Sequence, residues 1–194
     1  MRYVALGDSY TIGTSVDRGL RWPDQLVAAV ADLELVANLA VNGYTSQDVI
    51  DREMPALAGL RPELLTILVG VNDIVRGVPP ERYRRNVDRI LDELAVHVGS
   101  DRVLAVTTPD YTVTPAGADY GDPATQAAGI RTVNTILADA AITRGIALVD
   151  IYDLSLRAAG DRTLVASDGL HPSGAQYELW VERIAPAVRD MLAG

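Results

Sequence analysis

The chain has 194 residues, a formal net charge of −9 and 48% hydrophobic residues, which suits a single domain, residues 1–194, with a sizeable core. It contains no Cys and no Lys, which excludes thiol nucleophiles, disulfides, thiolate metal sites, Schiff bases and the lysine-dependent Walker phosphate loop. The acidic charge, without a basic patch, argues against a nucleic-acid partner.

Five short apolar runs predict the strands of a sheet, at residues 3–6, 34–39, 64–69, 102–107 and 146–150. Longer segments with helical periodicity predict helices at 22–31, 46–54, 80–98, 124–144 and from 173 towards 192. Ser173 and Gln176 have capping-box spacing, and Pro186 is expected to kink or end the last helix. Alternating strands and helices predict an α/β fold with a parallel sheet covered on both faces.

The stretch 108–123 is rich in Pro, Gly, Asp and Tyr and predicts a long functional or mobile loop. No apolar run is long enough to span a membrane, and the start of the chain has no signal-peptide pattern. We therefore expect a cytoplasmic protein, unless an upstream export segment has been removed.

Only two histidines occur, which narrows the candidates for a proton shuttle at neutral pH to His171 and His97. His97 lies in the last turn of a predicted helix and is expected to be a surface residue. Asp168 precedes His171 by three residues, so its carboxylate can contact the imidazole and fix its tautomer. Such a pair needs a nucleophile, and Ser9 follows the first predicted strand in the sequence Gly-Asp-Ser.

Further polar residues follow other predicted strands. Asn42-Gly43 comes after the second strand and Asn72-Asp73 after the third. Because functional groups of a parallel α/β sheet gather at the carboxyl ends of its strands, these segments and Ser9 are expected to converge. Each segment alone could be an ordinary turn or helix cap.

These motifs together resemble the SGNH hydrolases, also called GDSL-type esterases or lipases. The first block of that family matches Gly7 to Ser9 with the later Gly13, the second Gly43, the third Gly70 to Asp73 and the fifth Asp168 to Pro172. The four blocks occur in family order over most of the chain. The resemblance implies a three-layer α/β/α sandwich with a five-stranded, mostly parallel sheet in flavodoxin-like order.

The resemblance also implies roles for residues. Ser9 would be the nucleophile, His171 the base and Asp168 the residue that orients it. The oxyanion hole would combine the backbone N–H groups of Ser9 and Gly43 with the side chain of Asn72. The reaction would be hydrolysis of a small acyl ester through an acyl-enzyme, without cofactor or metal. Further candidates to line the substrate pocket are Asp8, Tyr44, Tyr111, Tyr120 and Leu170.

Alternatives remain open at this stage. The same acyl-enzyme would serve an acyltransferase, and a catalytically silent binding domain could retain the pocket. A flavodoxin-like mononucleotide binder would use the 7–13 segment as a phosphate loop. Within the resemblance, simple acyl esters, lysophospholipids, acyl thioesters and acetylated sugars are all candidate substrates. Acyl length and oligomeric state are not predicted.

Overall fold

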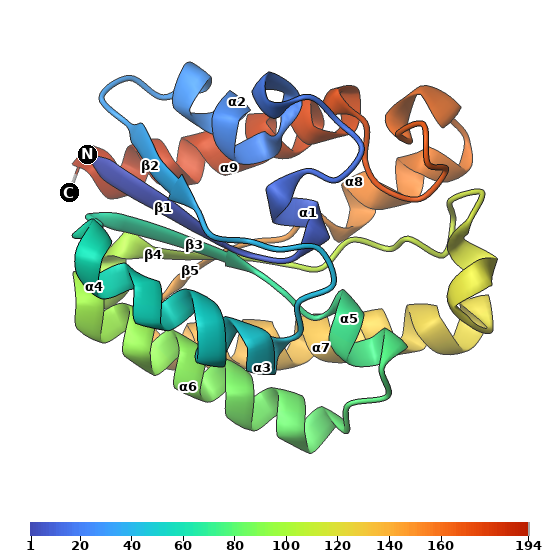
Figure 1. Cartoon of the computed structure of the whole chain (residues 1–194), viewed down its shortest axis with the longest axis horizontal. Coiled ribbons are helices and arrows are strands. Elements are labelled where there is room, and N and C mark those ends of the chain that lie inside the picture. Colours follow the sequence, from blue (N-terminus) through green and yellow to red (C-terminus); the bar gives the residue numbers. More distant parts are fainter. Residues whose placement is uncertain (194) are drawn as a thin grey trace.

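The computed structural model describes residues 1–193 and contains a single five-stranded sheet in these residues (Figure 1). The strands are β1 (Arg2–Gly7), β2 (Glu34–Asn38), β3 (Leu64–Leu68), β4 (Val103–Val106) and β5 (Ala147–Val149). Their order is β2-β1-β3-β4-β5 and every pair is parallel. This is the predicted flavodoxin-like order, in which the chain reverses direction across the sheet between β1 and β3.

Helices cover both faces of this sheet. The α-helices are α1 (Ser9–Ile12), α2 (Trp22–Ala29), α3 (Ser46–Asp48), α4 (Leu57–Leu60), α5 (Val71–Val75), α6 (Pro80–Val98), α7 (Pro123–Arg144), α8 (Tyr152–Leu156) and α9 (Gly174–Ala193). Figure 1 shows α2 and α9 on one face and α3, α4, α6 and α7 on the other. The three-layer α/β/α architecture predicted from the sequence is therefore confirmed.

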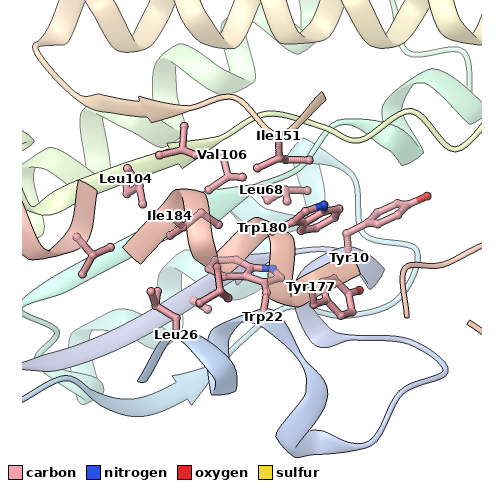
Figure 2. Close-up of a cluster of buried hydrophobic side chains, with 14 of the residues drawn as sticks. Tyr10, Trp22, Leu26, Leu68, Leu104, Val106, Ile151, Tyr177, Trp180 and Ile184 are labelled. Carbon is pink, nitrogen blue, oxygen red and sulfur yellow. The ribbon is translucent and has the colours of Figure 1, made fainter. Parts of the chain in front are cut away.

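Each face of the sheet has its own apolar core. On one face, Trp22 of α2 and Trp180 of α9 are fully buried, and the ring of Tyr177 meets Trp180 edge-on at 5.1 Å between centroids (Figure 2). On the other face, Ile90 and Leu94 of α6 lie in a second buried cluster with side chains of β3, β4 and α7. Burial on both faces explains why the strands are apolar without alternation.

The structure shows that the predicted capping box of α9 is incomplete and that Pro186 does not end the helix, while a kink at Pro186 stays a prediction. The capping box is only half formed: the N–H of Gln176 donates to Ser173 Oγ at 3.4 Å, but the N–H of Ser173 donates to the Leu164 carbonyl at 2.9 Å, so the Gln176 side chain has no capping role. The helix also continues through Pro186 to its last turn. Its neighbour Ala185 is buried, and this core packing holds the helix together despite the missing donor.

Candidate active site

Ser9 begins α1 directly after β1. Gly7 ends the strand with φ +147°, and a Cβ atom there would lie 2.2 Å from the carbonyl oxygen of Leu68, so only glycine fits this close approach. The buried Asp8 caps the helix, because its Oδ1 atom accepts a hydrogen bond from the N–H of Tyr10 at 3.0 Å. Ser9 is thereby held at the carboxyl end of the central strands.

Asp168 and His171 form a hydrogen-bonded pair in the loop before α9. Asp168 Oδ2 lies 2.6 Å from His171 Nδ1, and Oδ1 accepts backbone N–H groups of Leu170 and His171 at 2.9 and 3.0 Å. Ser15 Oγ donates to Oδ2 at 2.6 Å. Partial burial opposes ionisation of Asp168, but these hydrogen bonds outweigh it and hold its pKa well below the usual range. The pair therefore presents a charged carboxylate to a nearly buried imidazole.

Asn72 lies on α5, the short helix after β3. Its Nδ2 donates one hydrogen bond, 3.0 Å long, to the carbonyl oxygen of Tyr44, which leaves the second amide hydrogen for another acceptor. Gly43 has φ +84°, and its carbonyl oxygen accepts a 2.6 Å hydrogen bond from Arg76. This bond ties the loop after β2 to the end of α5.

One pocket brings together Ser9, Asn72 and His171. It has a volume of about 70 Å³. A hydroxyl, an imidazole paired with a carboxylate and a free amide hydrogen in one pocket can activate a nucleophile and stabilise a developing oxyanion. The residues that line it are Ser9, Tyr10, Asn42, Val71, Asn72, Val75, Tyr111, Tyr120, Leu170 and His171.

The structure separates the predicted pocket residues into two groups. Tyr111, Tyr120 and Leu170 line the pocket. Asp8 does not, because it is fully buried beneath α1, and the ring of Tyr44 instead lies under the guanidinium of Arg52 at 5.7 Å.

Gly43 also lies outside the residues that line the pocket, whereas its neighbour Asn42 lines it. The loop after β2 therefore reaches the pocket through Asn42.

Several residues that line the pocket or contact Asp168 were not predicted from the sequence. Tyr10, Val71 and Val75 line the pocket from α1 and α5, two helices too short for a periodic pattern. Ser15 reaches Asp168 over 153 positions of sequence, and no local motif marks it.

Three buried carboxyl groups, those of Asp8, Glu53 and Asp73, adjoin the segments that carry Ser9 and Asn72. Burial raises the pKa of Asp8 to about 7. Burial and, to a lesser extent, repulsion from Asp8 together raise the pKa of Glu53 to about 9. Glu53 Oε2 accepts the N–H of Gly7 at 2.9 Å. Burial also raises the pKa of Asp73, whose two oxygens accept hydrogen bonds from Ser46. These groups support the loops that carry Ser9 and Asn72.

Within residues 1–193, no group of three or more His, Asp or Glu side chains is arranged to hold a metal ion. The helices of the same residues include none that is long and apolar enough to cross a membrane.

The sequence is similar to a known protein family and to characterised esterases and thioesterases. The profile of the GDSL-like Lipase/Acylhydrolase family matches residues 5–179. The chain is 23% identical over 192 residues to Esterase TesA of Pseudomonas aeruginosa, covering 97% of this chain and 88% of the relative. It is 25% identical over 104 residues to Thioesterase 1/protease 1/lysophospholipase L1 of Escherichia coli K12, covering 54% of this chain and 50% of that one.

Solved structures share the fold. A lipase/acylhydrolase from Enterococcus faecalis superposes with a TM-score of 0.76 at 23% identity, covering 98% of this chain and 96% of the other. The crystal structure of TesA superposes with a TM-score of 0.73 at 21% identity, covering 98% and 99%.

Proposed function

The chain belongs to the GDSL-like lipase/acylhydrolase family, and from this premise we propose that it hydrolyses carboxylic esters with Ser9 as nucleophile, His171 as general base and Asp168 as the residue that orients His171. The observation that carries the proposal is the 2.6 Å contact between Asp168 and His171 in a pocket that Ser9 also lines. The family blocks coincide with these residues in sequence.

The proposed reaction begins with attack of Ser9 Oγ on the ester carbonyl carbon, while His171 Nε2 accepts the hydroxyl proton. Nε2 is the available nitrogen because Nδ1 faces Asp168, whose charge stabilises the imidazolium. The bond from carbon to the alcohol oxygen then breaks, and His171 returns the proton to that oxygen. Water attacks the resulting acyl-enzyme with the same base, releasing the acid and restoring Ser9.

The negative carbonyl oxygen of the intermediate needs hydrogen-bond donors. We assign this role to the N–H groups of Ser9 and Gly43 and to the free amide hydrogen of Asn72. The first N–H groups of a helix have no partner inside the helix, so Ser9 can donate from the start of α1. The hydrogen bond from Asn72 to the Tyr44 carbonyl supports this assignment, because it fixes the orientation of the amide.

Hydrolysis of p-nitrophenyl acetate by the wild type and by Ser9→Ala tests this proposal. The wild type should turn over the ester, and the variant should lose roughly 10⁶-fold in kcat, as removal of the nucleophilic serine does in a serine protease. Equal activity in the two proteins would refute the role of Ser9. In a second assay, an alcohol is added to the reaction. Formation of the new ester in preference to the free acid would favour an acyltransferase over a hydrolase.

A further inference from the structure

The candidate pocket is small for an esterase substrate. An apolar cavity of about 150 Å³ accommodates one benzene ring, so a pocket of about 70 Å³ accommodates about three non-hydrogen atoms. Beyond Ser9, Asn42, Asn72 and His171, its lining is apolar or aromatic: Tyr10 from α1, Val71 and Val75 from α5, Leu170 from the loop before α9, and Tyr111 and Tyr120. A short acyl group, with a polar carbonyl and a few apolar carbons, matches this size and this mixed polar and apolar lining.

Tyr111 and Tyr120, which form one wall of the pocket, are fixed in place by contacts with other residues. Tyr111 is 2% exposed, and its hydroxyl donates a 2.8 Å hydrogen bond to Gln126 of α7. The ring of Tyr120 packs edge-on against that of Tyr111, with centroids 6.0 Å apart. Moving Tyr111 outward would break the hydrogen bond and expose the ring to water.

The 108–123 segment that carries both tyrosines is also hydrogen-bonded to the loop before α9, which carries Asp168 and His171. The N–H of Ala116 donates to the carbonyl oxygen of Gly169 at 2.9 Å, and Gly169 lies between Asp168 and His171 in sequence. Gly117 packs so closely on the backbone of Tyr111 that a Cβ atom would lie 2.4 Å from its carbonyl oxygen. In Figure 1 this segment extends from the end of β4 towards the loops before α9. It forms a fixed wall of the pocket.

The pocket is better suited to the acyl part of an ester than to the alcohol. The alcohol must take its proton from His171 and depart before water enters, so it needs an open path to solvent. The acyl group stays bonded to Ser9 through both steps and can occupy the space beside Ser9 that Tyr111 and Tyr120 border. Since Tyr120 is 44% exposed, it lies at the margin between this space and solvent.

We propose that the enzyme takes esters of two- and three-carbon acids and that Tyr111 and Tyr120 set this limit. This inference rests on the proposed function, because it assumes an acyl group on Ser9. It predicts that acyl length, and not the identity of the alcohol, determines the rate.

The test is kcat/KM for p-nitrophenyl acetate, propionate, butyrate and octanoate. One surplus methylene in a fitted pocket costs about 10-fold or more, so octanoate should fall at least about 100-fold below acetate in the wild type. Tyr120→Ala should raise the octanoate-to-acetate ratio at least about 10-fold, because it removes part of the wall. Tyr120→Phe keeps the ring and should keep the wild-type ratio.

The ratio is independent of how much active protein each preparation contains. Octanoate turnover equal to that of acetate in the wild type would overturn the size limit. An unchanged ratio in Tyr120→Ala would overturn the assignment of Tyr120. Ser9→Ala separates these results from failure of the proposed function: a flat acyl profile that disappears in Ser9→Ala refutes only the size limit, whereas acetate hydrolysis that survives in Ser9→Ala refutes the proposed function itself.

Discussion

Ser15 donates a 2.6 Å hydrogen bond to Asp168, at the same carboxylate oxygen that contacts His171. Ser15 lies six positions after Ser9, so the bond connects the segment of the nucleophile to the loop of the base. The residue is also in the left-handed region, with φ +65°, which is unfavourable for any residue except glycine.

Replacement of Ser15 by two different residues tests its hydrogen bond to Asp168 separately from its positive φ. Ser15→Ala and Ser15→Gly both lose the hydroxyl, and water compensates in part because the site is exposed. Both variants should therefore lose roughly 3- to 10-fold in kcat/KM for p-nitrophenyl acetate. Ser15→Gly should melt at a higher temperature than Ser15→Ala because glycine tolerates the positive φ. Wild-type kcat/KM in both variants would show that the hydrogen bond does not position Asp168.

Asp168→Asn removes the charge and keeps the shape of the side chain. The amide no longer stabilises the imidazolium or selects the correct tautomer of His171, so kcat should fall by about 10³- to 10⁴-fold. Asp119→Asn is a matched control, since this exposed carboxylate lies on the segment that forms the pocket wall. A loss of similar size in both variants would point to general electrostatics instead of a specific role for Asp168.

The two asparagines of the pocket allow a direct comparison. Asn72→Ala should lose about 10²- to 10³-fold in kcat with little change in KM, because an oxyanion donor acts mainly in the transition state. Asn42→Ala, which changes a side chain lining the same pocket, should cost much less. If the larger loss appears in Asn42→Ala, the assignment of the amide donor is wrong.

The raised pKa of the buried Glu53 carboxyl predicts that the stability of the protein depends on pH. Its pKa is raised to about 9 in the folded protein, against about 4.3 in an unfolded chain. Between these values the folded protein binds the additional proton, so the free energy of unfolding should fall as pH rises through this range. Asp8 contributes in the same direction up to about pH 7. The wild-type melting temperature should therefore decrease between pH 7 and 9, by roughly 2–4 °C for each kcal/mol lost.

Glu53→Gln removes this titration and should flatten the dependence between pH 7 and 9. Glu178→Gln, at an exposed position on α9, should follow the wild type. Thermal melts of the three proteins at several pH values provide the measurement. Parallel curves for Glu53→Gln and the wild type would mean that Glu53 does not titrate in this range.

Apolar patterning predicted the five strands and the long helices closely. The predicted helix 80–98 coincides with α6, because Pro80 begins it, Gly99 ends it and the apolar positions repeat at helical spacing. The predicted helix 46–54 is less regular in the structure, which divides it into α3, a π-helical turn at Val49–Glu53 and a 3₁₀ turn at Met54–Ala56. Pro55 accounts for this, since its ring and missing N–H disrupt the preceding turn.

The elements that build the pocket were harder to predict. α1 and α5 have four and five residues, too few for a periodic signal, and they form because strand ends and close glycine contacts position them. Motifs identified Ser9, Asn72 and the pair of Asp168 and His171. Contacts such as that of Ser15 with Asp168 join distant parts of the chain and have no local pattern.

Covalent labelling of Ser9 tests the central claim most directly. Incubation with a serine-directed phosphonate, followed by intact mass measurement and peptide mapping, should show one adduct per chain on Ser9. The same treatment of His171→Ala should give little labelling, because the hydroxyl then lacks its base. Adduct at another serine, or equal labelling of Ser9 in wild type and His171→Ala, would contradict a nucleophile activated by His171.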